Sequence, residues 1–192
     1  MNREVTGIFG GTFNPVHPAH VELARGIVGC GAVGEVWLTL SPENPLKADR
    51  PGATDGDRRD MLEAACSGVE GVSPCFIEFD LPRPSYTITT LRALAAKYPN
   101  RDFRLIIGAD NWQIFNRWRQ PEDIIADFGV VIYPRPGYDV AGPLPKGVTY
   151  LADLPVFDIS STEIRSNIAD NLQRLAPAVA NIIKQRNLYA TI

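Results

Sequence analysis

The sequence predicts an α/β fold in which a doubly wound, mostly parallel sheet carries helices on both faces. Short runs of β-branched and aromatic residues alternate with segments of helical apolar spacing, and the connections leave little room for hairpins. Polar segments that contain glycine directly follow two of these runs. Because ligands bind beyond the carboxyl ends of the strands in such sheets, the residues that follow strands are the first candidates for a functional site.

The composition indicates a single globular domain, expected to span residues 1–192. Hydrophobic residues make up 45% of the chain and charged residues 21%, which is enough for a sizeable core and disfavours disorder. The net charge of −3 argues against a general nucleic-acid binder, which would show a broad basic face. No apolar run approaches the roughly 20 residues that span a bilayer, and no signal peptide is recognisable, so we expect no membrane association and a cytoplasmic location.

The first half of the chain begins with an apolar, β-prone run at residues 5–9, followed by an amphipathic helix at 18–28 that Pro18 opens. A second strand at 35–40 leads into an irregular stretch at 41–56 that is rich in Pro, Gly and Asp. The next expected elements are a helix through 61–65, a third strand at 76–79, a proline-containing loop at 81–86 and a helix at 87–98.

The second half continues the alternation with a strongly apolar strand at 103–107, which ends in Gly108-Ala109-Asp110. Four prolines and three glycines mark residues 134–147 as a loop. The remaining expected elements are short helices at 111–115 and 121–126, strands at 129–133 and 148–151, and C-terminal helices at 161–169 and 177–185. This order is typical of a Rossmann-like fold with a small helical C-terminal portion.

The segment from Gly10 to His20 follows the first strand and holds both histidines of the chain. Neither the GxGxxG dinucleotide pattern nor the Walker pattern occurs there, which disfavours a conventional NAD-dependent dehydrogenase and a P-loop NTPase. Gly10 and Gly11 allow a ligand to approach the backbone closely, and the helix start offers N–H groups to an anion. His17 and His20 lie near one side of the first turn, where each can donate a hydrogen bond to that anion and become protonated.

A purely structural role and a metal site both compete with an anion site at this segment. One capping and one half-buried histidine would account for the pair structurally, but their concentration beside a glycine turn favours function. A metal site is disfavoured because no cysteine or third histidine completes a ligand set. The three cysteines, Cys30, Cys66 and Cys75, form no CxxC pair and are expected to be reduced thiols.

A second candidate is the segment that ends at Arg165. Ser160 and Glu163 form a capping box, which predicts the start of a helix. A cap needs only one hydroxyl, but Ser161 and Thr162 add two more directly after Ser160. Hydroxyls, N–H groups and the Arg165 guanidinium at a helix N-terminus would suit a polyphosphate. The alternative is that the segment is only a helix cap, and the sequence by itself does not favour either interpretation.

Single residues after other strands are weaker candidates. Lys47 follows the second strand, where it is either solvated or within reach of a phosphate. Asp110 follows the fourth strand, where a carboxylate binds ribose hydroxyls or a metal, or caps a helix. Trp112 and Trp118 either pack in the core or offer a stacking face to an aromatic ring. Arg135, in a Pro-Arg-Pro-Gly loop, is either a loop arginine or a phosphate ligand.

Taken together, these segments resemble the HxGH nucleotidyltransferase superfamily and, more closely, the bacterial nicotinate-nucleotide adenylyltransferases. The resemblance runs nearly from end to end, and its first and last motifs are highly specific in combination. In the HxGH signature Ala19 replaces the glycine, and the segment Pro45-Leu46-Lys47 keeps the lysine of the family pattern but lacks its histidine. The resemblance is carried by Gly10-Gly11-Thr12-Phe13-Asn14-Pro15-Val16-His17, Asn44-Pro45-Leu46-Lys47, Arg59-Asp60-Met61-Leu62, Ser85-Tyr86-Thr87 with Thr90-Leu91, Gly108-Ala109-Asp110, Phe115 with Trp118, Arg135-Pro136-Gly137-Tyr138 and Ile159-Ser160-Ser161-Thr162-Glu163-Ile164-Arg165.

The resemblance implies adenylyl transfer, in which the 5′-phosphate of nicotinate mononucleotide attacks the α-phosphorus of ATP and releases pyrophosphate. It implies catalytic roles for His17, His20 and Arg165, and Mg²⁺ that is bound through the ATP phosphates without a protein metal site. The implied ATP-binding residues are Gly10, Gly11, Thr12, Phe13, His17, His20, Gly108, Asp110, Ser160, Ser161, Thr162 and Arg165. The implied residues for nicotinate mononucleotide are Asn44, Lys47, Tyr86, Thr87, Trp118 and Arg135.

Three alternatives to this function stay open from the sequence: nicotinamide mononucleotide as the acceptor, phosphopantetheine as the acceptor, and a non-catalytic nucleotide sensor. Trp118 and the loop at Tyr86 weigh against phosphopantetheine, whose arm is not aromatic. The two histidines together with Arg165 weigh against a sensor, which needs no catalysis at the α-phosphate. Backbone N–H groups near Thr87 suit a carboxylate better than an amide, which predicts a preference for nicotinate. A homo-oligomer is compatible with the sequence but is not predicted by it.

Overall fold

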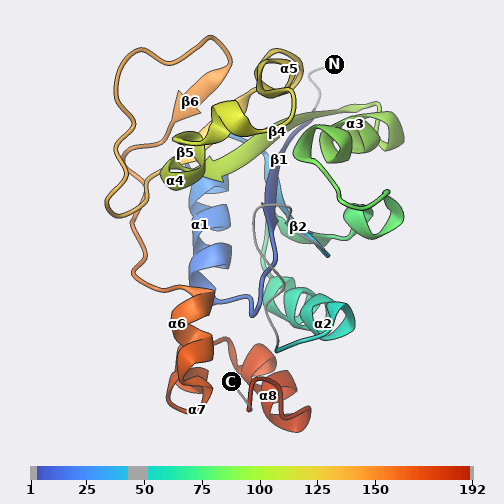
Figure 1. The fold of residues 1–192 in the computed structure, drawn as a ribbon, viewed down its shortest axis with the longest axis vertical. Helices are drawn as coiled ribbons and strands as arrows, with labels where there is room; N and C mark the ends of the chain where they lie inside the picture. Colours follow the sequence, from blue (N-terminus) through green and yellow to red (C-terminus); the bar gives the residue numbers. More distant parts are fainter. Residues whose placement is uncertain (1–3, 43–51, 191–192) are drawn as a thin grey trace.

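The computed structural model describes residues 4–42 and 52–190. Its centre is a six-stranded sheet in the order β3-β2-β1-β4-β5-β6, and every neighbouring pair of strands is parallel (Figure 1). The predicted doubly wound α/β class is therefore confirmed. The strands are β1 (Glu4–Gly11), β2 (Glu35–Leu40), β3 (Val72–Cys75), β4 (Arg101–Gly108), β5 (Val130–Tyr133) and β6 (Val148–Tyr150).

The order of the strands reverses at β1. From β1 the chain moves outward to β2 and β3 on one side, and it then returns to place β4 on the other side of β1. Ile8 of β1 lies beside Leu105 of β4, and Gly10 lies beside Thr39 of β2. The crossovers therefore leave in opposite directions from the carboxyl ends of β1 and β4, which is where doubly wound sheets bind their ligands.

Helices cover both faces of the sheet because side chains alternate along each strand. On β4, Ile106 belongs to the core cluster under α1, α2 and α8, whereas Leu105 and Ile107 belong to the cluster under α3 and α5 (Figure 1). The helices and 3₁₀ turns are α1 (Pro18–Gly29), α2 (Asp55–Cys66), η1 (Ile77–Asp80), α3 (Thr87–Lys97), α4 (Ala109–Trp112), η2 (Phe115–Arg117), α5 (Pro121–Asp127), α6 (Ser161–Ser166), α7 (Ile168–Asn171), η3 (Leu172–Arg174) and α8 (Pro177–Gln185).

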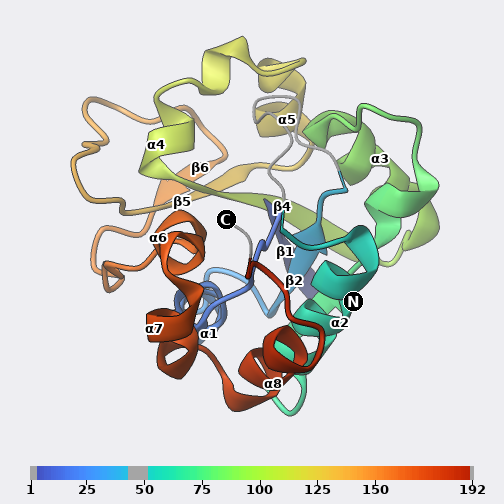
Figure 2. The same ribbon diagram turned by 60° about the horizontal axis from the view of Figure 1, so that its bottom comes forward.

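The C-terminal helices pack beside the ends of α1 and α2 (Figure 2). Two ion pairs hold the end of α8 to α2, because Arg186 contacts Asp57 at 2.8 Å and Asp60 at 2.6 Å. Buried residues of α8, among them Val179 and Ile183, join the core cluster of α1 and α2. The predicted small helical C-terminal portion is thus packed onto one layer of the fold.

Three element predictions were wrong. The third strand is β3, and residues 76–79 fall mostly in the 3₁₀ turn η1, where the Phe79 N–H donates to the Phe76 carbonyl oxygen. Pro74 lies inside β3, where it is tolerated because β3 is an edge strand. The helix predicted at 161–169 breaks at Asn167, which has φ −151° and ψ 78° and caps α7 through its side chain. The helix predicted at 111–115 is replaced by α4, which starts at Ala109, and by η2.

Candidate active site

The loop between β1 and α1, residues 12–17 (the β1–α1 loop), lies at the carboxyl end of β1. Phe13 has φ 42°, a left-handed conformation that is uncommon for any residue other than glycine. Its ring is buried, stands edge-on to the His20 ring at 4.9 Å and packs under Gly11, where an added Cβ would come within 3.1 Å of it. A Cβ added at Gly10 would meet no atom within 4 Å. The backbone is therefore fixed by packing on one side and open on the other, as a ligand site requires.

The two histidines form one stacked pair at the start of α1. Their ring centroids are 3.7 Å apart, with an interplanar angle of 30°. The backbone N–H of His17 donates to Nδ1 of His20 at 3.2 Å. In the neutral form of His20 this bond assigns the ring proton to Nε2, so that Nε2 is a donor. The stacking and this bond thus hold the two rings together at the start of α1.

The residue His17 is only 6% exposed. Burial, together with the nearby Arg135 and Arg174 guanidinium groups, lowers the pKa of His17 from 6.5 to about 4, against a smaller opposing effect of Glu163. His17 is therefore neutral at pH 7. Protonation beside an anion, as predicted from the sequence, would require the ligand's charge to raise this pKa.

Residues after β4 and β5 form the facing side of the site. The Nε of Arg135 lies 3.6 Å from Oδ1 of Asp110. The ring of Tyr133 packs 5.6 Å from that of Phe9, whose ring is in turn 6.2 Å from His20. This chain of contacts brings the predicted residues of three strand ends to one place.

Gly108 is sterically required there. An added Cβ would lie 2.3 Å from Oδ1 of Asp110, 2.8 Å from Cγ of Arg135 and 3.1 Å from the ring of Tyr133. Real Cβ atoms do not approach other atoms so closely, so the positions of Asp110 and Arg135 depend on glycine at 108.

The start of α6 contacts the β1–α1 loop although about 150 residues separate the two segments. Ser161 donates through Oγ to the Pro15 carbonyl oxygen at 2.9 Å, with a sequence separation of 146. The buried Arg165 donates through Nη1 to the Asn14 carbonyl oxygen at 2.5 Å. Ser160 accepts from the Glu163 N–H at 3.1 Å, which confirms the predicted helix cap. The structure therefore joins the two specific motifs of the sequence.

Three of the residues predicted to bind nicotinate mononucleotide lie on segments of the other helical layer. Tyr86 precedes α3 and stacks with Arg119, whose guanidinium carbon is 4.7 Å from the Tyr86 ring centroid. Trp118 follows η2 and packs on Phe115 at 5.4 Å. Thr87 is the first residue of α3. Of the other three predicted residues, Arg135 lies beside Asp110, and Asn44 and Lys47 lie outside the described residues.

Buried polar atoms that lack a hydrogen bond belong to the same residues; one of them, Oδ1 of Asp110, still has the ionic contact with Arg135. Within residues 4–42 and 52–190, three buried side-chain polar atoms have no hydrogen-bond partner: Nδ1 of His17, Oδ1 of Asp110 and Nε1 of Trp118. An unsatisfied buried polar group costs about 1–3 kcal/mol, so such atoms are uncommon unless a ligand completes them. All three belong to residues that the sequence had singled out.

The sequence reasoning missed three buried polar residues around the site. Arg58 donates to the Thr12 carbonyl oxygen at 2.7 Å, and Tyr189 donates to Oδ1 of Asn14 at 2.6 Å. Glu78 accepts from Ser85 and Thr90 beside the predicted acceptor loop. No local pattern marks these residues, since each contact depends on segments that meet only in the folded chain.

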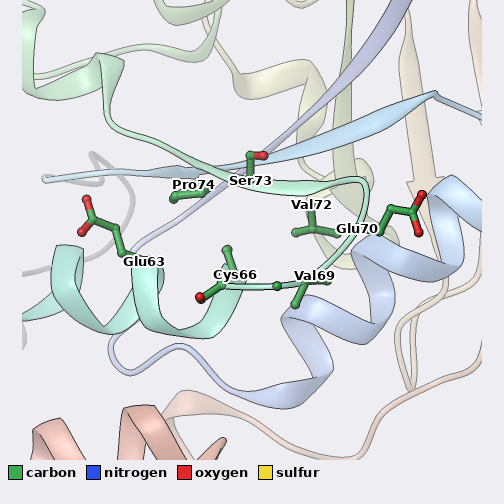
Figure 3. Close-up of a pocket in the computed structure, with 9 residues that line it drawn as sticks. Glu63, Cys66, Val69, Glu70, Val72, Ser73 and Pro74 are labelled. Atoms are coloured by element: carbon green, nitrogen blue, oxygen red, sulfur yellow. The ribbon is translucent and has the colours of Figure 1, made fainter.

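No metal centre is found in the part of the chain that the structure describes, because no group of three or more His, Cys, Asp or Glu side chains there could hold an ion. A hollow of about 530 Å³ lies between the end of α2 and β3 and is lined by Cys66, Glu63 and Glu70, among others (Figure 3). Burial raises the pKa of the Cys66 thiol to about 12, so the thiol is inert at neutral pH. None of the helices in the described ranges is long and apolar enough to cross a membrane.

Comparison with known proteins places this geometry in a family. Residues 8–167 match the family described as cytidylyltransferase-like. The chain belongs to this family. A protein of Bacteroides fragilis named "probable nicotinate-nucleotide adenylyltransferase" is 42% identical over 190 residues, which cover 97% of this chain and 94% of that protein. A Bacteroides thetaiotaomicron protein of the same name is 47% identical over 85% of this chain and 81% of its own length. The family resemblance inferred from the sequence motifs is therefore confirmed.

A solved structure supports the fold of this family member independently. Plasmodium falciparum nicotinic acid mononucleotide adenylyltransferase, complexed with NaAD, aligns with a TM-score of 0.77 over 98% of each chain, at 17% identity. At that identity the likeness concerns the fold alone.

Proposed function

We propose that this cytidylyltransferase-like protein is a nicotinate-nucleotide adenylyltransferase, which makes nicotinate adenine dinucleotide and pyrophosphate from ATP and nicotinate mononucleotide. The observation that supports the proposal is the contact between the start of α6 and the β1–α1 loop, where Ser161 and Arg165 donate to the carbonyl oxygens of Pro15 and Asn14 next to the stacked histidine pair. Relatives that are 42% and 47% identical bear the name of this activity.

The proposed reaction needs no protein nucleophile, because the phosphate of the acceptor attacks the α-phosphorus of ATP directly. The protein must align two anions that repel each other and stabilise charge on the departing pyrophosphate. In this proposal His20 donates from Nε2 to the α-phosphate, beside the stacked ring of His17. The start of α6 and Arg165 bind the β- and γ-phosphates, opposite the loop that they already contact.

The remaining proposed roles carry the family resemblance over to the other side chains. Asp110 binds the ribose of ATP, and its neighbour Arg135 contributes positive charge to the acceptor phosphate. Trp118 stacks on the pyridine ring, and Thr87 with nearby N–H groups at the start of α3 receives the carboxylate. Mg²⁺ would be bound by ATP phosphate oxygens and water, where it neutralises phosphate charge. Roles for Asn44 and Lys47 beside the acceptor phosphate complete the proposal.

The experiment that tests this function measures pyrophosphate release with ATP, Mg²⁺ and one acceptor at a time. The acceptors are nicotinate mononucleotide, nicotinamide mononucleotide and phosphopantetheine. We expect kcat/KM to be highest for nicotinate mononucleotide and about tenfold or more lower for the amide, since its NH₂ group needs acceptors where the site offers N–H donors. Equal values for the acid and the amide would contradict the proposed specificity, and no turnover with any acceptor would contradict the activity. A single domain over residues 1–192 and a cytoplasmic location stay predictions.

A further inference from the structure

Side chains from distant parts of the chain hold the β1–α1 loop in place. Arg58 of α2 donates to the Thr12 carbonyl oxygen at 2.7 Å. On the other side, the carbonyl oxygens of Asn14 and Pro15 accept from α6, as described above. A fourth bond comes from the C-terminal end of the chain, where the Tyr189 hydroxyl donates to Oδ1 of Asn14 at 2.6 Å. Asn14 is thus held both through its backbone and through its side chain.

The bond between Tyr189 and Asn14 is shielded from water. Tyr189 is 3% exposed and Asn14 is 7% exposed. Burial raises the pKa of the Tyr189 hydroxyl, so it stays protonated and acts as a donor over the whole physiological range. If the Tyr189 hydroxyl were removed, Oδ1 of Asn14 would be buried without its hydrogen-bond donor. This cost would favour a shift of the β1–α1 loop that gives Oδ1 another donor.

The backbone after α8 directs Tyr189 to this position. Asn187 and Tyr189 have φ 50° and 65°, left-handed conformations that turn the chain back from α8 toward β1 (Figure 2). Arg186 fixes the start of this turn through its ion pairs with Asp57 and Asp60. Packing thus holds the backbone in an unfavourable conformation that places the Tyr189 hydroxyl against the β1–α1 loop.

We propose that Tyr189 is a positioning residue for catalysis: its hydroxyl fixes Asn14 and thereby the placement of His17 and His20. This inference rests on the proposed adenylyl transfer. Asn14 lies three residues before His17, and its carbonyl oxygen binds Arg165 of the opposing half of the site. A displacement of about 1 Å in a reacting geometry can lower a rate by about 100-fold, so loss of this bond acts on turnover as well as on stability.

The kinetic test separates the hydroxyl of Tyr189 from its ring. Tyr189→Phe keeps the buried ring and removes only the donor. We expect kcat to fall about tenfold or more, with KM for nicotinate mononucleotide unchanged within about twofold, because Trp118 and Thr87 lie in the other helical layer. The matched control is Ile183→Val, a conservative change in α8 that loosens the packing of the same C-terminal segment but keeps the hydroxyl. Unchanged kcat in Tyr189→Phe, or an equal fall in the control, would overturn the proposal.

A spectroscopic test does not depend on turnover. The chain has only two histidines, so a sample with ¹⁵N-labelled histidine reports on His17 and His20 alone. We expect the imidazole resonances to shift in Tyr189→Phe and to keep their wild-type positions in Ile183→Val. Identical spectra in wild type and Tyr189→Phe would contradict the positioning role even if the proposed reaction proves wrong. Conversely, a wild-type protein without turnover would refute the reaction and leave this test intact.

A double-mutant cycle with Asn14→Ala connects the two residues. Once the amide oxygen of Asn14 is absent, adding Tyr189→Phe should cause no further change in the imidazole resonances or in kcat. If the two residues acted independently, their effects on kcat would multiply. If Tyr189→Phe does not fold, Asn14→Ala by itself carries the test. It should reproduce the shifted resonances and the loss of kcat, and wild-type values in this variant would overturn the proposal.

Discussion

The buried imidazole of His17 makes the stability of the protein depend on pH. Its folded-state pKa of about 4 lies below the value of 6.5 for an exposed histidine, so the unfolded chain takes up this proton first as the pH falls. The stabilising contribution of neutral His17 to the free energy of unfolding is therefore fully present above pH 6.5. It decreases progressively as the pH falls from 6.5 to about 4. Between pH 7.5 and pH 5 the contribution of His17 is a loss of about 2 kcal/mol in the free energy of unfolding.

His17→Gln isolates this contribution, because the glutamine does not titrate. Urea unfolding of both proteins at pH 7.5 and pH 5 should show wild type losing about 2 kcal/mol more than the variant, since all other groups titrate in both. The same loss in the two proteins would show that His17 is not held neutral.

Two glycines of the site should respond differently to the same added methyl group. A Cβ at Gly10 meets no atom within 4 Å and would enter the space that we propose for ATP, whereas one at Gly108 collides with Asp110 and Arg135. We therefore expect Gly10→Ala to keep the melting temperature while KM for ATP rises about tenfold. Gly108→Ala should raise KM for ATP and also lose about 1–3 kcal/mol of stability. Steady-state kinetics and thermal unfolding of the two variants test these expectations. A wild-type KM for ATP in Gly10→Ala would show that ATP does not bind beside Gly10.

Among the secondary-structure elements, Glu78 connects η1 to the start of α3. Its two carboxylate oxygens accept from Ser85 at 3.0 Å and from Thr90 at 2.9 Å, on either side of the predicted acceptor residues Tyr86 and Thr87. A glutamine at position 78 keeps the shape but turns one acceptor into an NH₂ donor, so one hydroxyl must turn its proton away and accept instead, which changes the hydrogen bonding at the start of α3. We expect Glu78→Gln to raise KM for nicotinate mononucleotide about tenfold and to leave KM for ATP within about twofold.

The matched control for Glu78→Gln is Glu63→Gln, an exposed position in α2 with only a surface ion pair. It should not change either KM, because surface pairs contribute little. If Glu78→Gln raised KM for ATP instead, the start of α3 would belong to the ATP side of the site.

The sequence predicted best those elements that local chemistry defines. Pro18 at a helix start and the Ser160 cap could be predicted because each depends on neighbouring residues alone. The position of β3 could not, since Pro74 is tolerated there only because β3 is the edge of the sheet. Arg58 and Tyr189 also escaped prediction, as their partners lie 46 and 175 residues away in the sequence. Local patterns thus indicate the residues that face a ligand, whereas the residues that hold them depend on the fold.

At the scale of the whole molecule, the site exists because the two ends of the chain meet at the carboxyl edge of one sheet. Arg165 is the physical link, with Nη1 bonded to the Asn14 carbonyl oxygen at 2.5 Å and Nη2 to Oγ1 of Thr162 at 3.3 Å. A lysine side chain has one nitrogen on a flexible stem and does not reproduce the planar two-nitrogen fork that bonds both partners. Arg165→Lys should therefore lower kcat and also destabilise the protein by about 1–3 kcal/mol.

Hydrogen exchange can test whether this link couples the two halves. Because α6 and the β1–α1 loop are held to each other, amides of both segments should exchange faster in Arg165→Lys, while those of β4 and β5 stay protected. Saturating ATP should restore protection to both segments together, since a ligand that binds the assembled site stabilises it as a unit. Faster exchange confined to α6 would show that the loop is held without Arg165, and the two halves of the site would then be structurally independent.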